Sequence, residues 1–318
     1  GYGLSQVMFA LTGNLPMMIL SRLFSGIFAG ATYSVAYGYV SDISERQMKS
    51  ANIAKIGSIA IIGGALGAKI GGQVAVMNTT YPFILQLILS IVVTGLLFFF
   101  LKDTEEDEEE TKSKRLSDLK GLNPLSAFRY IKGLDSSSKF FVLIVFMSGV
   151  GIFSYNSSII YFLKFYKNVS SNTIGTFTML SSLLAFLGTS FLLKWMLKKH
   201  KEISIYRVFV TLGILIMILS LVILEKGLIP YVLFSIYTMS YEIVRTLGNS
   251  ILANRFKRDQ GKILGIATGM GSLGMAVGSL ISGYLLAMDS YLPFIVNIVM
   301  MSLVIGLLIY NNFINTKK

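Results

Sequence analysis

Residues 63–72 read Gly63-Gly64-Ala65-Leu66-Gly67-Ala68-Lys69-Ile70-Gly71-Gly72 and lie inside a long apolar run. Gly63, Gly67 and Gly71 are four residues apart, so on a helix they stack on one face. In water each glycine would cost that helix about 1 kcal/mol relative to alanine. In a bilayer glycines instead let a second helix approach closely. The stretch therefore predicts a packed membrane helix that carries one charge, Lys69.

The composition is that of a membrane protein. Of the 318 residues, 53% are hydrophobic and only 14% are charged, whereas soluble domains have about 25% charged residues. The chain has no cysteine, and its one histidine, His200, lies among lysines. We find no nucleophile–base set, phosphate loop or metal-ligand cluster, so we expect no enzyme activity, no cofactor and no metal.

Apolar runs of about 20 residues recur, as spanning helices require. We predict ten membrane segments, at about 1–13, 16–40, 52–77, 81–101, 139–163, 172–193, 205–224, 229–254, 263–287 and 292–312. The first run is too short to cross a hydrocarbon core of about 30 Å as a helix. It therefore resembles the end of a helix that begins upstream.

Lysine and arginine predict the orientation. Alternate connections hold 22 of the 28 basic residues, and the remaining connections hold only Lys164, Lys167 and Lys226. The basic connections are therefore expected to be cytoplasmic. These charges are dispersed over short loops rather than gathered on one folded face, which argues against nucleic-acid binding.

One long polar stretch, 102–138, divides the chain into 1–101 and 139–318. It begins with an acidic block from Asp103 to Glu110 and then becomes basic, which is typical of a solvated linker. Asn123-Pro124 predicts the start of a short helix on the inner membrane surface.

The glycine stretch occurs twice. At an offset of 211 residues, Gly63, Gly67 and Gly72 coincide with Gly274, Gly278 and Gly283, and Pro82-Phe83-Ile84 coincides with Pro293-Phe294-Ile295. This predicts two homologous halves of parallel topology, an arrangement found in secondary transporters. By the same offset, two helices and part of a third are expected before Gly1, which would make twelve in the intact protein.

These motifs resemble those of the major facilitator superfamily, in particular its drug:proton antiporter branch of the tetracycline-efflux type. Gly63, Gly67, Gly71 and Gly72 match the antiporter motif, with Ala68 where the motif has proline. Arg22-Leu23-Phe24-Ser25-Gly26 resembles the arginine motif of the preceding helix, and Ser41-Asp42-Ile43-Ser44 resembles its cytoplasmic end. The resemblance implies an all-α membrane protein of the major facilitator fold. It would have two pseudo-symmetric six-helix halves, with the first half truncated and ten segments present.

The resemblance also implies which residues govern conformational change. Asp42 would brace a basic loop at the cytoplasmic end. The glycine faces would be the close-packed surfaces on which the two halves rock, and their members are Gly63, Gly67, Gly71, Gly72, Gly274, Gly278 and Gly283.

Ionisable residues inside membrane segments are candidate functional residues because each charge at mid-membrane costs about 2.5–3.5 kcal/mol. Glu242 and Arg245 are three residues apart on one helix, so their side chains can pair. Thr238, Tyr241, Arg245 and Asn249 form a polar stripe on that helix, which we expect to face a wet cavity. Glu242 is then the candidate proton carrier, and a purely structural ion pair is the alternative.

Two more basic residues, Arg22 and Lys69, lie within membrane segments. For Arg22 we expect a partner in upstream helices, on the substrate or in Glu242, or a side chain that extends to the outer surface. For Lys69 we expect the same outward extension, an anion contact or a salt bridge between halves. Tyr155 and Asn156 are candidates for lining the cavity or for packing.

The sequence therefore predicts a multi-pass secondary transporter of the plasma (inner) membrane, working as a monomer within the lipid bilayer. It would export a small amphipathic substrate or drug by alternating access, coupled to protons. Two alternatives remain: a transporter of organic or phosphorylated anions, and a truncated membrane protein that does not transport.

Overall fold

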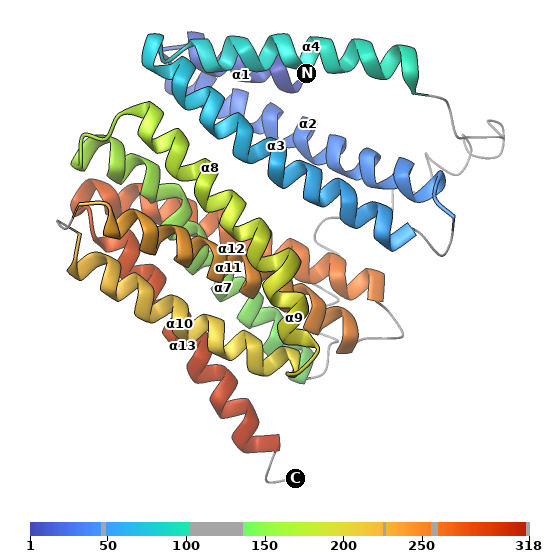
Figure 1. Ribbon diagram of the computed structural model, residues 1–318, viewed down its shortest axis with the longest axis vertical. Coiled ribbons are helices and arrows are strands. Elements are labelled where there is room, and N and C mark those ends of the chain that lie inside the picture. The colour runs from blue at the N-terminus through green and yellow to red at the C-terminus, as the bar shows by residue number, and fades with distance from the viewer. Residues whose placement is uncertain (46–48, 102–135, 225–226, 256–259, 316–318) are drawn as a thin grey trace. The chain divides into compact units, whose positions relative to one another are not determined.

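The structure, a computed structural model, describes residues 1–45, 49–101, 136–224, 227–255 and 260–315. Every regular element in these ranges is a helix (Figure 1). All ten predicted membrane segments are confirmed as helical. The main helices are α1 (Tyr2–Leu11), α2 (Leu15–Asp42), α3 (Lys49–Met77), α4 (Tyr81–Phe100), α7 (Ser136–Tyr161), α8 (Ser171–Leu187), α10 (Glu202–Val222), α11 (Ile229–Arg255), α12 (Gln260–Met288) and α13 (Leu292–Asn315). The predicted linker and the surface helix at Asn123 fall on residues 102–135, outside the described residues.

Eight of the helices in the described ranges are long and apolar enough to cross a membrane. α4 shows why lipid is the solvent that suits them, because none of its residues is buried. Its last three residues, Phe98, Phe99 and Phe100, are about 80% exposed. Apolar surface of this extent is stable when it faces acyl chains rather than water.

Two π-helical turns lengthen the fifth and sixth segments beyond their predicted ends. η1 (Phe162–Tyr166) continues α7, and η2 (Gly188–Leu192) joins α8 to α9 (Leu193–Leu197). Lys194 therefore lies within a helix and not in the connection after it. A lysine is tolerated near a membrane helix end because its long stem can carry the ammonium group to the surface.

The helices form two compact units. Unit 1 contains residues 1–119 and 170–179, and unit 2 contains 120–169 and 180–318. In unit 1, α1 packs against α2 and α4, and α3 contacts both of these helices. A Cβ added to Gly72 on α3 would lie 2.6 Å from the carbonyl oxygen of Ser171 and 2.9 Å from the Cα of Gly175. The two backbones touch here, and glycine is the residue that permits it.

In unit 2, α12 packs along α7, α10 packs along α11, and α13 contacts α7 and α10 (Figure 1). Gly274 and Gly278 of α12 make the closest part of the first contact. A Cβ on either would collide with a carbonyl oxygen of α7, that of Phe146 or that of Val150. These two glycines therefore pack helices inside unit 2, and their expected role in the rocking of the halves stays a prediction.

The other glycines of the two faces have no such contact. An added Cβ at Gly63, Gly67, Gly71 or Gly283 would meet no atom of the described chain within 4 Å. Four-residue spacing identifies a smooth helix face, but it does not say which neighbour, if any, packs there.

Candidate functional site

An ion pair and a cavity meet on α11. Glu242 and Arg245, one helical turn apart, lie 2.7 Å from each other between Oε2 and Nη2. The side chain of Arg245 is 52% exposed and that of Glu242 is 23% exposed. The arginine is therefore the more accessible partner, while the carboxylate is held close to the helix.

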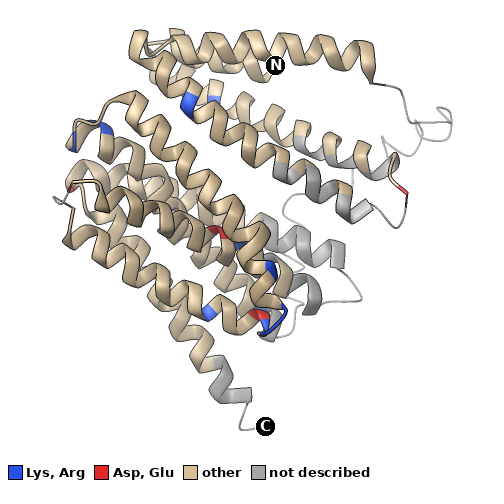
Figure 2. Cartoon of the chain, viewed as in Figure 1, with Lys and Arg blue, Asp and Glu red and all other residues tan. Residues whose placement is uncertain are grey.

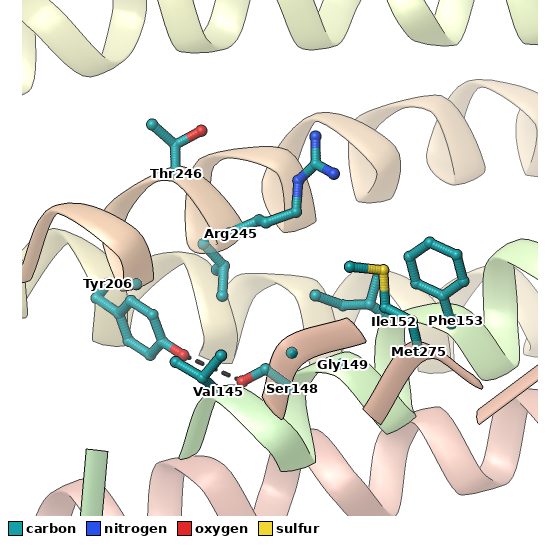
Figure 3. Close-up of a pocket in the computed structure, with 12 residues that line it drawn as sticks. Val145, Ser148, Gly149, Ile152, Phe153, Tyr206, Arg245, Thr246 and Met275 are labelled. Carbon is teal, nitrogen blue, oxygen red and sulfur yellow. Dashed lines mark hydrogen bonds between the residues drawn. The ribbon is translucent and has the colours of Figure 1, made fainter. Parts of the chain in front are cut away.

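Arg245 lines a cavity of about 360 Å³ within unit 2. The walls come from α7, α10, α11 and α12, and Figure 3 shows the lining side chains. They are Val145, Ser148, Gly149, Ile152, Phe153, Tyr206, Val244, Arg245, Thr246, Gly248, Gly271 and Met275. Most of this surface is apolar, and Arg245 is the one charged residue among its described lining residues. Pockets with apolar walls and a few polar groups are the usual form of small-molecule sites.

The two ends of the cavity differ in chemistry (Figure 3). At one end the hydroxyls of Ser148 and Tyr206 are hydrogen-bonded to each other at 3.2 Å, and both residues are buried. At the other end lie the phenyl ring of Phe153 and the thioether of Met275. Aromatic rings and flexible methionine side chains can adapt to apolar ligands of differing shape.

The polar stripe predicted on α11 is divided between core and cavity. Tyr241 is 8% exposed and packs in an aromatic cluster with Tyr155 and Tyr237, whose ring centroids are 6.3 Å and 5.9 Å from its own. Among the members of the stripe whose side chains are described, Arg245 alone lines the cavity. The side chain of Asn249 lies outside the described residues.

Tyr155 has the environment of a core residue. Only 1% of it is exposed, and its ring lies among Phe234, Tyr237, Tyr241 and Phe294 at centroid distances of 4.7–6.3 Å. Its hydroxyl is 3.4 Å from the hydroxyl of Thr238. The next residue, Asn156, is exposed and does not line the cavity described above. The structure thus places neither beside Arg245.

Arg22 has partners on α1 that the sequence analysis missed. Its Nη1 donates a hydrogen bond to Oε1 of Gln6 at 3.1 Å, and its guanidinium lies 3.7 Å from the ring centroid of Phe9. Gln6 in turn donates to the hydroxyl of Ser25 at 2.8 Å. Partners in the same chain were not among those expected for Arg22, and the expectation of a further partner upstream, on a substrate or in Glu242 stays a prediction. A neutral amide oxygen and an aromatic face together stabilise a cation without an acid.

Lys69 also has neutral partners, all within unit 1. Its ammonium group donates to Oδ1 of Asn172 at 2.8 Å and to the hydroxyl of Thr176 at 2.6 Å. Both residues belong to the first turns of α8, next to the Gly72–Gly175 contact. Asp42 ends α2, but its side chain lies outside the described residues.

The cavity was only partly visible in the sequence. Charge identified Arg245 and Glu242, but Ser148, Tyr206, Phe153 and Met275 are ordinary residues of apolar helices. One glycine, Gly149, was a weak indication of the site. A Cβ at this position would lie 2.7 Å from the carbonyl oxygen of Gly271. Glycine at that place indicates a close helix contact, and the cavity lies beside it.

Comparison with known proteins places the chain in a family. The model of the Major Facilitator Superfamily matches residues 1–257. Multidrug resistance protein 2 of Bacillus subtilis (strain 168) is 22% identical over 303 residues, which are 92% of this chain and 72% of that protein. Quinolone resistance protein NorA of Staphylococcus aureus is 28% identical over 207 residues, 58% of this chain and 53% of NorA.

Among solved structures, the crystal structure of a D-xylose-proton symporter superposes with a TM-score of 0.68. The match covers 96% of this chain and 77% of the symporter at 14% sequence identity, so it bears on the fold alone. The family match spans most of the chain, and the fold, the apolar helices and the relatives agree with it. The chain therefore belongs to the Major Facilitator Superfamily and is a multi-pass membrane transporter.

Proposed function

We propose that this transporter exports small amphipathic compounds across the plasma membrane in exchange for protons, by alternating access. The observation that carries the proposal is the Glu242–Arg245 ion pair at a mostly apolar cavity. Such a cavity suits a ligand with an apolar body and a few polar groups. The multidrug and quinolone resistance proteins among its relatives support export rather than uptake.

Glu242 is the proton carrier in this proposal. As a carboxylate it accepts the Arg245 guanidinium in a charge-assisted hydrogen bond. When Glu242 takes a proton, the pair loses most of its attraction and the guanidinium becomes available to the cavity. The proton on Glu242 and the compound in the cavity thus both change the interactions of Arg245. Binding of either one therefore changes the affinity of the protein for the other. Reciprocal coupling of this kind is what exchange requires.

The test is transport by the Glu242→Gln variant in proteoliposomes under an imposed pH gradient. Glutamine keeps the size of the side chain but cannot carry a proton. We expect pH-driven accumulation to be abolished while binding of a fluorescent amphipathic dye is retained. Glu202→Gln is the matched control, because Glu202 lies at the start of α10, where its Oε1 accepts a hydrogen bond from Ser250. Undiminished pH-driven flux in Glu242→Gln would refute the assignment.

A second candidate function is the transport of organic or phosphorylated anions. The half-exposed guanidinium of Arg245 favours it, because a planar fork of N–H donors matches a carboxylate or phosphate group. Flux measurements with an anionic panel and with uncharged analogues of the same size distinguish the two functions.

A further inference from the structure

The turn between α9 and α10 carries a concentration of positive charge. Four exposed lysines, referred to below as the lysine turn, lie within eight residues: Lys194 on α9 itself, and Lys198, Lys199 and Lys201 after its end. Figure 2 shows the basic residues gathered at this end of α9. Between residues 191 and 207 the one acidic residue is Glu202, and its Oε1 accepts a hydrogen bond from Ser250 on α11.

Next to the lysine turn lies the only tryptophan of the chain. Trp195 is 57% exposed, and the ammonium group of Lys199 is 5.2 Å from the centroid of its ring. One turn earlier, Phe191 is 64% exposed. The rings and the turn thus follow in the order phenyl ring, indole and lysine, with Lys194 between the two rings, where its long stem can carry the ammonium group toward the surface.

This order matches the depth profile of one bilayer leaflet. Acyl chains favour a phenyl ring, the interface favours tryptophan, and the headgroup layer favours lysine ammonium groups. The distribution of basic residues assigns the turn to the cytoplasmic side, where anionic lipids attract clusters of lysines next to a membrane helix. The exposed groups of this surface therefore suit, in turn, the acyl, interfacial and headgroup layers of one leaflet.

We propose that the lysine turn and Trp195 form a binding site for an anionic phospholipid of the inner leaflet. The lysines contact the headgroup phosphate, Trp195 lies against the glycerol and carbonyl region, and Phe191 lies against the first part of an acyl chain. The site does not depend on which compound is transported, because none of these residues lines the α11 cavity.

The single tryptophan supplies the measurement. The whole chain is reconstituted into phosphatidylcholine vesicles that contain the same small fraction of either brominated phosphatidylglycerol or brominated phosphatidylcholine. Bromine quenches indole fluorescence on contact, so quenching reports which lipid lies next to Trp195. We expect brominated phosphatidylglycerol to quench several-fold more than brominated phosphatidylcholine at the same fraction. Raising the salt concentration should reduce the difference, because it screens the lysines.

Substitution separates a headgroup site from general attraction. Lys198→Gln and Lys199→Gln should each lower the preference for the anionic lipid, by about fivefold per lysine. Lys167→Gln, which removes the same charge just after η1, should leave it unchanged. Size-exclusion chromatography verifies that each variant remains monodisperse. Equal quenching by the two lipids, absence of quenching, or an unchanged preference in the lysine variants would each overturn the proposal.

Discussion

Arg245 binds Glu242 at 2.7 Å, leaves half of its own side chain exposed, and is one of the residues that line the cavity. The geometry of the pair explains how both are possible. A spacing of three residues brings the carboxylate to one side of the guanidinium, and the guanidinium has N–H donors on its other edge. Arg245 can therefore bind a second acceptor either at the same time as the Glu242 carboxylate or in place of it.

A first prediction concerns the second acceptor. Arg245→Gln should weaken binding of an amphipathic carboxylate by about tenfold relative to its uncharged amide, because a hydrogen bond to a charged group contributes about 1.5–3 kcal/mol and water screens a half-exposed group. Isothermal titration of the purified variant against both compounds measures the ratio. Lys139→Gln, a loss of charge at an exposed residue outside the cavity, is the control. Equal weakening for both compounds would show that Arg245 does not contact the anionic group.

A second prediction tests the cavity itself. Met275 lines it and is half-buried, so Met275→Trp should place a bulky ring in the space that a ligand needs. We expect binding of large amphipathic dyes to fall at least tenfold, while small ones are affected less. Met288→Trp is the control, because it makes the same substitution on the same helix. Met288 ends α12 and is 64% exposed. If both variants bind large dyes as the parent does, the cavity is not the substrate site.

A third prediction concerns the α7–α12 contact. Gly278→Ala would drive a methyl group into the carbonyl of Val150, and overpacking of this kind costs about 1–3 kcal/mol. The melting temperature of the purified protein should fall. Gly283→Ala on the same helix meets open space among the described residues, so it should be neutral or slightly stabilising. A similar loss in both variants would point to helix flexibility and not to the contact.

The helices could be predicted well because membrane segments follow from length and apolarity alone. The four-residue spacing also predicts that these glycines share a helix face, since stacking at that spacing is a property of any helix. It could not say that Gly274 and Gly278 pack on α7 while Gly63 and Gly67 have no described neighbour. The choice of neighbour depends on tertiary contacts that no single helix encodes.

The partners of charges within membrane segments are hard to predict for a related reason. For Arg22 the sequence suggested an upstream helix, the substrate, Glu242 or extension to the outer surface. The structure uses Gln6 and Phe9, which are uncharged. Neutral partners are numerous in any sequence, so only their position in three dimensions distinguishes them. Glu242 and Arg245 were easier to identify because both are charged and both lie on one helix.

A final prediction concerns the partners of Lys69. Its ammonium group can extend to water or bind neighbouring polar groups, and the two arrangements predict different coupling energies. If its ammonium group extends to water, the neighbouring polar groups contribute nothing to it. If it donates to Asn172 and Thr176, as in the structure, the interaction must be visible as coupling. A double-mutant cycle isolates that coupling from the other effects of each substitution. The cycle combines Lys69→Met with Asn172→Ala, and its readout is thermal stability of the purified protein.

We expect a coupling energy of about 0.6–2 kcal/mol, the range measured for polar contacts between membrane helices. A second cycle with Thr176→Val should give a value of the same sign, because the same ammonium group donates to both oxygens. Thr178→Val is the control, since the Thr178 hydroxyl donates to the carbonyl of Ile174 in its own helix. Coupling near zero in both cycles, with Lys69→Met alone neutral, would mean that the ammonium group is hydrated at the membrane surface. Coupling in both cycles would show that the hydrogen bonds of Lys69 join α3 to α8 beside the Gly72–Gly175 contact.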